Sequence, residues 1–549
     1  SPFYLNTAPR PWFTTKGNPR RGGVSSFGFG GSNFHVVLEE YQPDKKEIAW
    51  DGSVEILAFS GPDTAAIANG LLQVQEGLGD DFDTAALSRT ARSLRTAFSS
   101  DHRHRLILVV NTAFDGHDLK ERLQQAVAVV TEGKPAVMAA QGIYYDPAPQ
   151  TAGKIAFMFP GQGSQYPHMG RDLVCCFPGA MEAVQAADHR FDQEPPLWEI
   201  LFPRPAISED QRQRQTDDLR RTDVAQPAIG AVSLAMLSAL GYFNVRPDVT
   251  CGHSYGELTA LHAAGWISQE TLLRLSVTRG RLMADAGKNV DAGTMLAVNA
   301  PIDRLQALAD QIADVVLANL NSPDQGVLSG TTEAIEQAKA RCAEKGYRTI
   351  SLPVSAAFHS PLVEGAQKPF CIAAEKATFT PTRIPVYANV TAAPYPADAS
   401  QCADMLGRQL TSTVRFQETV EHLYESGVHT FVEVGPKTVL SGLVRATLKE
   451  RNVTVIALDR SSGKASGIMD LAHAIGHLAA LGVDLDLNRW ETEAPAVRPQ
   501  KMTIPLSGTN YRAPRKTNST PKTDHSGTTP PPQAQSGPAT SLTRTVVNT

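Results

Sequence analysis

Residues 252–256 read Gly-His-Ser-Tyr-Gly, which is the Gly-x-Ser-x-Gly pattern of a nucleophile elbow. The apolar residues 249–251 predict the end of a strand, and residues 258–264 predict a helix that stops at Gly265. A turn between the two has to be tight, and small residues on both sides let the backbone close. It would hold the Ser254 hydroxyl at a helix N-terminus, where backbone N–H groups can stabilise an oxyanion. A turn without chemistry fits these five residues about as well, so the assignment depends on other segments.

Two further segments favour chemistry at this turn. Residues 154–159 (KIAFMF) predict a buried strand that runs into the glycine-rich loop 160–165 (PGQGSQ), and glycines let a backbone approach a ligand closely. Residues 354–361 (VSAAFHSP) place His359 in a turn, although a single histidine is more often structural than catalytic. Together, the serine, the loop and the histidine supply a nucleophile, an oxyanion donor and a base.

Five strings now occur in order along the chain, and this is far more specific than one elbow. They are 159–165 (FPGQGSQ), 252–257 (GHSYGE), 279–283 (RGRLM), 357–361 (AFHSP) and 433–436 (EVGP). With these strings the chain resembles the malonyl-CoA:acyl-carrier-protein acyltransferases of fatty acid and polyketide synthases. The segment VSAAFHSPLVEGAQKPF is similar to the acyltransferase of polyunsaturated fatty acid synthases.

The N-terminal segment resembles another part of the same multienzymes. Residues 25–40 (SSFGFGGSNFHVVLEE) are similar to the final segment of a β-ketoacyl synthase, and Phe34 is closer to the polyunsaturated type. The sequence holds only this tail, so we expect no condensing activity and give His35 a structural role. The resemblance implies a ketosynthase body upstream as a partner.

The resemblance implies a two-step transfer. Ser254 would take the malonyl group from malonyl-CoA as an acyl-enzyme, and the phosphopantetheine thiol of an acyl carrier protein would then accept it. His359 would be the base in both steps. The backbone N–H groups of Gln162 and Tyr255 would form the oxyanion hole. His253 is a weaker candidate for the base, because neighbours on a tight turn point apart.

An arginine is expected to select the substrate. Arg279 matches the family motif, and a guanidinium can hold the free malonyl carboxylate through two parallel hydrogen bonds. Arg281 would point about 200° away on the same helix, so only one of the two should face the cleft. A surface position is the alternative for Arg279.

Three more residues complete the implied site. The second nitrogen of the base needs an acceptor. The family match for it falls on Gln409, for which a helix-surface position is equally possible, and Asn389 is a nearby alternative. Phe358 should crowd an α-methyl branch and favour malonyl over methylmalonyl, although Ala356 replaces the histidine usual in malonyl-type enzymes.

The predicted fold class is α/β, with a hydrolase-like parallel-sheet core, an inserted ferredoxin-like subdomain and a small α/β linker domain. The order βαββαβ over residues 294–354 predicts the ferredoxin-like insert. The expected domains are the ketosynthase tail (1–45), the linker domain (46–153), the large acyltransferase subdomain (154–290 and 355–450), the small subdomain (291–354), a post-acyltransferase linker (451–514) and a disordered tether (515–549).

Composition excludes several classes of protein. The net charge of −5 gives no basic surface for nucleic acid, and we see no run of about 18 apolar residues that would span a membrane. The six cysteines form no CxxC pair or metal-ligand spacing, so we expect no metal or redox cofactor and a reduced, cytoplasmic setting. We expect the fragment to be a monomer, because the ketosynthase body is the usual dimer contact.

Two other functions compete with acyl transfer. A serine thioesterase or hydrolase of the α/β-hydrolase type also uses this elbow, but it needs an acid before its histidine in chain order, and none is evident. A non-catalytic scaffold that docks carrier domains is the second alternative. The set Ser254, His359 and Arg279 argues against a scaffold.

Overall fold

The computed structural model describes residues 4–14, 18–28, 33–41, 47–78, 83–113, 116–148, 152–286, 292–354 and 356–491. Two compact units are present: Ser1–Arg20 with Glu39–Val497, and Arg21–Leu38 with Arg498–Thr549. Residues 492–514 of the predicted post-acyltransferase linker and the whole predicted tether lie outside the described residues.

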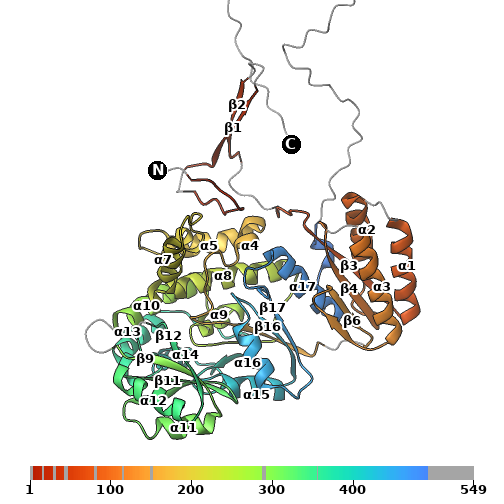
Figure 1. Ribbon diagram of the computed structural model, residues 1–549. Helices are drawn as coiled ribbons and strands as arrows, with labels where there is room; N and C mark the ends of the chain where they lie inside the picture. Colours follow the sequence, from red (N-terminus) through yellow and green to blue (C-terminus); the bar gives the residue numbers. More distant parts are fainter. Residues whose placement is uncertain are drawn as a thin grey trace, which may run out of the picture. The chain divides into compact units, whose positions relative to one another are not determined.

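A six-stranded sheet forms the centre of the large unit (Figure 1). Its order is β14 (Ala393–Pro394), β13 (Val386–Ala388), β8 (Val249–Gly252), β7 (Lys154–Phe159), β16 (Val428–Glu433) and β17 (Thr454–Ala457). All neighbours from β13 to β17 are parallel, and β14 is antiparallel to β13. The inner strands β7, β8, β13 and β16 are largely buried, as expected for a parallel sheet with helices on both faces. Parallel pairing brings the carboxyl ends of β7, β8 and β13 to one edge.

The helices of this core include one that is exceptionally apolar. Among the described residues, α8 (Thr222–Tyr242) is the one helix whose length and mean hydropathy would allow it to cross a membrane, although polar residues interrupt it. Its most apolar window is 83% buried, however, and the helix packs against α5 and α10, so it is a core helix. The other helices are α4 (Arg171–Cys176), α5 (Pro178–Arg190), α6 (Leu197–Leu201), α7 (Glu209–Arg220), α9 (Gly256–Ala263), α10 (Gln269–Ala286), η1 (Pro361–Val363), α13 (Glu364–Glu375), α14 (Ala399–Arg408), α15 (Phe416–Glu425) and α16 (Val439–Thr447).

The small subdomain has the order βαββαβ that the sequence predicts. It runs through β9 (Thr294–Asn299), α11 (Ile302–Ala309), β10 (Val315–Ser322), β11 (Gln325–Gly330), α12 (Thr332–Glu344) and β12 (Arg348–Leu352). The strand order β12-β9-β11-β10 is that of a ferredoxin-like sheet. A fifth strand, β15 (Val414–Arg415), pairs in parallel with β10 and was not predicted. The predicted fold class is confirmed.

The linker domain is an antiparallel sheet with two apolar faces. It comprises β3 (Val54–Gly61), α1 (Thr64–Leu78), α2 (Thr84–Ala97), β4 (His104–Asn111), α3 (Gly116–Glu132), β5 (Ala136–Met138) and β6 (Ile143–Asp146), with the strand order β3-β4-β6-β5. Leu57 and Phe59 on one face share a core with the helices α1–α3. Ile56 and Ala58 alternate to the other face and join the main core, where α17 (Gly467–Ala480) covers the sheet (Figure 1).

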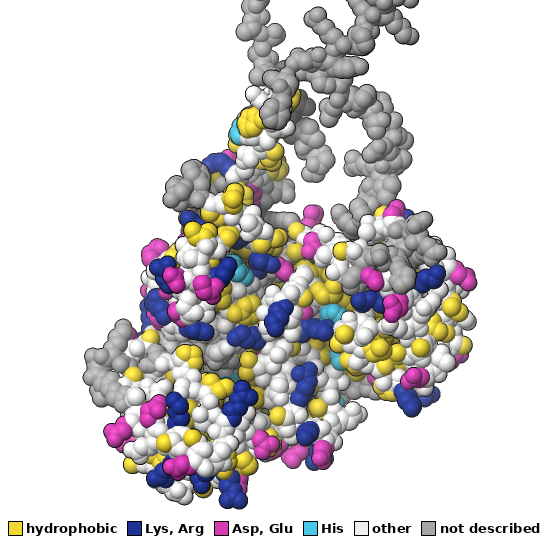
Figure 2. Space-filling view, in the orientation of Figure 1, with side chains coloured by type: hydrophobic (Ala, Val, Ile, Leu, Met, Phe, Trp, Pro, Cys, Tyr) yellow, Lys and Arg dark blue, Asp and Glu magenta, His cyan; other side chains and the backbone are white. Residues whose placement is uncertain are grey.

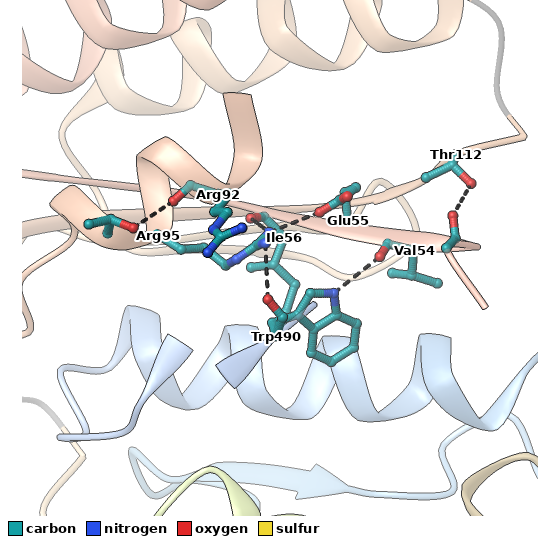
Figure 3. A network of polar contacts seen from close by, with 9 residues as sticks. Val54, Glu55, Ile56, Arg92, Arg95, Thr112 and Trp490 are labelled. Atoms are coloured by element: carbon teal, nitrogen blue, oxygen red, sulfur yellow. Dashed lines mark hydrogen bonds and ion pairs between the residues drawn. The ribbon is translucent and has the colours of Figure 1, made fainter. Parts of the chain in front are cut away.

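A network of polar contacts fastens the linker sheet to the end of the described chain (Figure 3). The Arg95 Nη1 donates to Glu55 Oε2 at 2.8 Å, and its Nη2 donates to the Trp490 carbonyl at 3.1 Å. Trp490, just after η2 (Leu487–Arg489), donates its indole N–H to the Val54 carbonyl at 3.1 Å and packs on Phe243. Glu55, Arg95 and Trp490 are all buried.

The smaller unit contains a two-stranded sheet, β1 (Arg21–Phe27) and β2 (Asn33–Glu39). Its large apolar side chains are open to solvent, and Figure 2 shows them in yellow over this sheet. Phe27 is 75% exposed, Val37 68% and Phe34 62%. An isolated pair of strands is marginally stable in water, so these side chains need a partner to be buried.

Candidate active site

The predicted elbow forms between β8 and α9. Ser254 adopts a left-handed conformation with φ of 51°, which lifts its side chain out of the turn. A Cβ added to Gly252 would lie 2.1 Å from the carbonyl carbon of Gly256, and one added to Gly256 would lie 1.9 Å from the Phe159 carbonyl oxygen. Both glycines are therefore required for the turn to close against the end of β7.

Asn389 supports the elbow from the neighbouring strand. It follows β13, which pairs with β8, and its Oδ1 accepts the Ser254 N–H at 2.7 Å. Its Nδ2 donates to the Gly252 carbonyl at 2.6 Å. Asn389 thus contacts the backbone that carries Ser254, whereas the sequence suggested it as an acceptor for His359.

His359 lies against Ser254, with its Nε2 2.7 Å from Ser254 Oγ. Its Nδ1 is 3.0 Å from the Gln409 carbonyl and 3.1 Å from the Ser412 carbonyl. Two carbonyls can only accept, so Nδ1 carries the proton and Nε2 is left to accept one from the serine. Burial, with the charge of Arg279 as the second cause, lowers the pKa of His359 to about 3. The imidazole is therefore neutral at neutral pH.

Arg279 reaches the same point from α10 and is buried. Its Nη2 donates to Gln409 Oε1 at 2.9 Å and to Ser254 Oγ at 3.3 Å. Burial lowers the pKa of the guanidinium to about 10, so it stays charged at neutral pH. Arg281 points away and pairs with Asp192, which agrees with the helical geometry. Of the two arginines, Arg279 is the one that faces the cleft.

Gln409 is buried at the end of α14 rather than on a helix surface. Its carbonyl oxygen orients the imidazole of His359. Its side chain contacts other residues: Oε1 accepts from Arg279, and Nε2 donates to the Ser254 carbonyl at 2.6 Å.

The expected oxyanion donors lie on the facing loop and in the elbow. Neither the N–H of Gln162 nor that of Tyr255 has an acceptor among the described residues. A Cβ on Gly161 would lie 2.5 Å from the His253 carbonyl oxygen and 3.5 Å from the Tyr255 nitrogen, so the loop backbone closely approaches the elbow. The two N–H groups are available to a substrate oxygen.

Gln162, Ser254, Arg279 and His359 line a cavity of about 260 Å³. The loop after β7, the elbow, α10 and α16 line it on one side, and β9, β10 and β11 of the small subdomain line it on the other. Phe358 is buried in the wall next to His359. His253 also lines the cavity, but its Nε2 contacts Asn321 Oδ1 at 2.8 Å and not Ser254. The described part of the chain contains no group of three or more His, Cys, Asp or Glu that could hold a metal.

Comparison with known proteins agrees with this geometry. Residues 156–466, more than half of the chain, match the family described as acyl transferase domain. The chain belongs to the acyl transferase domain family. The N-terminal residues 2–109 match a second family, the ketoacyl-synthetase C-terminal extension. The resemblance found in the sequence is confirmed, and the protein is an acyltransferase enzyme.

Relatives of this acyltransferase are parts of multienzymes. It is 32% identical to a polyunsaturated fatty acid synthase subunit from Thraustochytrium sp., over 93% of this chain and 19% of the relative. It is 33% identical to the spectinabilin polyketide synthase system protein NorB of Streptomyces orinoci, over 92% of this chain and 23% of the relative. The chain thus spans about a fifth of the length of these relatives.

Solved structures of acyltransferases superpose on it. The acyltransferase domain from the second module of the salinomycin polyketide synthase has a TM-score of 0.60 and 29% identity, covering 83% of this chain and 98% of that chain. The acyl-carrier-protein-S-malonyltransferase from Bartonella henselae has a TM-score of 0.52 and 32% identity, covering 60% and 100%.

Sequence reasoning gave no role to a buried glutamate of the acyltransferase site. Glu257 lies in the first turn of α9, three positions after Ser254, and is fully buried. Its Oε2 accepts from the Asn389 N–H at 2.9 Å and from Gln409 Nε2 at 3.2 Å, and its Oε1 accepts from the Tyr395 hydroxyl. The sequence signal that could have found it is a single carboxylate in a mostly apolar helix, since a carboxylate that is buried there must have hydrogen-bond donors around it.

Proposed function

We propose that this acyltransferase transfers the malonyl group of malonyl-CoA to the phosphopantetheine thiol of an acyl carrier protein. The observation that carries the proposal is the buried guanidinium of Arg279, 3.3 Å from Ser254 Oγ at the cavity. An acyl chain without a charge would leave this cation without a counter-ion in the cleft. A malonyl carboxylate supplies one. The similarity to a solved malonyltransferase supports the same substrate.

In the first step, Ser254 Oγ attacks the thioester carbonyl carbon while His359 Nε2 takes its proton. The carbonyl oxygen becomes an oxyanion that the N–H groups of Gln162 and Tyr255 stabilise. Collapse of this intermediate breaks the carbon–sulfur bond, and His359 gives the proton to the departing CoA sulfur. The product is malonyl-Ser254 with free CoA.

The second step reverses the first with a different thiol. The carrier thiol loses its proton to His359 Nε2 and attacks the ester of Ser254, and the proton passes to Ser254 Oγ as the ester bond breaks. Neither step needs a metal or redox cofactor. The low pKa of His359 keeps its imidazole neutral at neutral pH, with Nε2 able to accept the proton, and it also makes this imidazole a weaker base than a free histidine.

Phe358 is proposed to discriminate between extender units. Its ring lies in the cavity wall, next in sequence to the base. An α-methyl branch on the bound acyl group would meet this ring, so malonyl should be preferred over methylmalonyl. The gain from excluding one methyl group is about 1–3 kcal/mol.

The partners are proposed from the parent multienzymes. The exposed apolar sheet β1–β2 supports a ketosynthase body that buries it, and an acyl carrier protein supplies the acceptor thiol. A cytoplasmic location belongs to the same proposal, because it gives access to CoA thioesters.

The test is the intact mass of the purified chain after incubation with malonyl-CoA, methylmalonyl-CoA or acetyl-CoA. We expect a malonyl adduct that is absent from Ser254→Ala. An adduct that turns over to free malonate faster than it passes to a carrier protein would support the hydrolase instead. No adduct from any donor would support the docking scaffold.

The surroundings of His359 favour the transferase over the hydrolase, since backbone carbonyls and not a carboxylate orient its Nδ1.

A further inference from the structure

Glu257 connects the two halves of the site. It contacts neither the cavity nor Ser254 Oγ; its carboxylate accepts from Asn389 N–H, Gln409 Nε2 and the Tyr395 hydroxyl. Asn389 in turn holds the Ser254 backbone, and Gln409 holds Arg279. A buried carboxylate is costly unless it is fully hydrogen-bonded, so these three donors are needed to keep it in place.

The contact with Gln409 fixes the direction of an amide. A primary amide has one end that donates and one that accepts. The NH2 end of Gln409 lies between Glu257 Oε2 and the Ser254 carbonyl, at 3.2 and 2.6 Å, and both are acceptors. The acceptor end must then face the other way, toward Arg279 Nη2 at 2.9 Å. If the amide turned round, its NH2 group would face the guanidinium and repel it.

The two buried charges are therefore linked through a neutral group. Glu257 and Arg279 have no direct ion pair; the Gln409 amide lies between them, accepting from the cation and donating to the anion. Arg279 keeps its place beside Ser254 without being neutralised by a carboxylate in contact with it. A guanidinium in this state can still pair with an incoming carboxylate.

We propose that Glu257 is a positioning residue for substrate selection: by orienting the Gln409 amide, it holds Arg279 where the carboxylate of the acyl group must bind. The inference rests on the proposed malonyl transfer. It separates two effects of Glu257. The contact with Asn389 supports the elbow and affects every acyl donor equally, whereas the contact with Gln409 affects only donors that carry a carboxylate.

The experiment compares acylation of Ser254 by malonyl-CoA and acetyl-CoA in Glu257→Gln, measured as single-turnover rates by intact mass. The substitution keeps the shape but brings an NH2 group into a place that three donors surround. We expect the malonyl-to-acetyl rate ratio to fall about tenfold, the effect of one lost hydrogen bond to a charged group. Adding Glu257→Gln to Gln409→Ala should leave the ratio of the single Gln409→Ala variant unchanged, because the amide is already absent.

Glu433→Gln is the matched control. Glu433 is also a fully buried glutamate of the same domain, but its carboxylate accepts from the N–H groups of Leu440 and Ser441 at the start of α16. Glu433→Gln should change the malonyl-CoA and acetyl-CoA acylation rates by the same factor. The thermal midpoint of each variant shows how much of any rate loss comes from unfolding.

Each other outcome overturns the inference. Equal loss of both rates in Glu257→Gln would reduce Glu257 to a support of the elbow, and unchanged rates would remove it from the site. A wild-type chain that accepts acetyl as fast as malonyl would overturn the role of Arg279, and the inference with it. A selective wild type with an equally selective Glu257→Gln would overturn the inference alone.

Discussion

The linker domain and the active site each contain a buried glutamate and a buried arginine, but the two pairs are connected in different ways. Arg95 touches Glu55 directly at 2.8 Å and also donates to two backbone carbonyls. Arg279 makes no ion pair with a carboxylate of the described residues, and the Gln409 amide separates it from Glu257. The direct ion pair connects a strand and a helix of the linker domain, whereas a pair with an amide between its members leaves the cation able to bind a ligand.

The largest effect should come from breaking the direct pair. Arg95→Met leaves the Glu55 carboxylate and the Trp490 carbonyl buried without their donor, so the free energy of unfolding should fall by about 3–5 kcal/mol. Urea denaturation measures this loss. The malonyl-to-acetyl rate ratio of the folded fraction should stay at the wild-type value; a changed ratio would mean that the linker network also serves the active site.

Breaking the indirect pair should change selectivity more than stability. Arg279→Ala should slow acylation by malonyl-CoA about 100-fold, or about 2–3 kcal/mol, because charge-assisted hydrogen bonds to the substrate are lost. Acylation by acetyl-CoA should be unchanged or faster. Arg281→Ala, which removes a solvent-exposed ion pair with Asp192, is the control and should cost at most about 1 kcal/mol of stability. Retained malonyl selectivity in Arg279→Ala would contradict the assignment.

The charge of Arg279 should also be visible in the pH profile. Burial and this charge lower the pKa of His359 to about 3, so acylation by acetyl-CoA should stay constant from pH 8 to pH 5, without a decline near the usual histidine value. Arg279→Ala removes one of the two main causes of the low His359 pKa. The pH below which the acylation rate declines should therefore be higher in this variant. A wild-type rate that halves near pH 6.5 would show that the imidazole is not shifted.

The smallest effect is expected at the edge of the linker network. Burial, with Glu55 as a second cause, raises the pKa of Glu491 to about 8. The folded state thus holds this proton more tightly than the unfolded state does, and its stabilising effect is lost as pH rises from the usual glutamate pKa of 4.5 to about 8. The thermal midpoint should fall between pH 5 and pH 8, and fall less in Glu491→Gln. An equal fall in both would exclude Glu491 as the cause.

Sequence patterns predicted the parts of the fold that are local. The elbow and the βαββαβ insert follow from residue periodicity and glycine positions, which act within one or two elements. The pairing of β15 with β10 and the packing of α17 on the linker sheet were not predictable, because they join segments far apart in the chain. Ser412 is a similar case, since its carbonyl meets His359 only after the chain has folded.

The positions of the site residues show the same limit. Ser254, His359 and Arg279 could be named because each chemistry needs a certain side chain in a certain motif. The side chain of Gln409 could not be interpreted, since its function depends on Glu257 on one side and Arg279 on the other. A residue that acts through two contacts has no signature in its own segment.

Neither of the two residues placed to react, Ser254 and His359, is a glycine, yet both have left-handed backbones, with φ of 51° and 57°. Such a conformation costs an L-residue about 1 kcal/mol or more. Glycine at either position would relieve this strain and remove the reacting group, so a chain selected only for thermal stability would drift toward an inactive protein. Screens for more stable variants of this enzyme should therefore be read together with acylation, because part of the strain that they relieve belongs to the site.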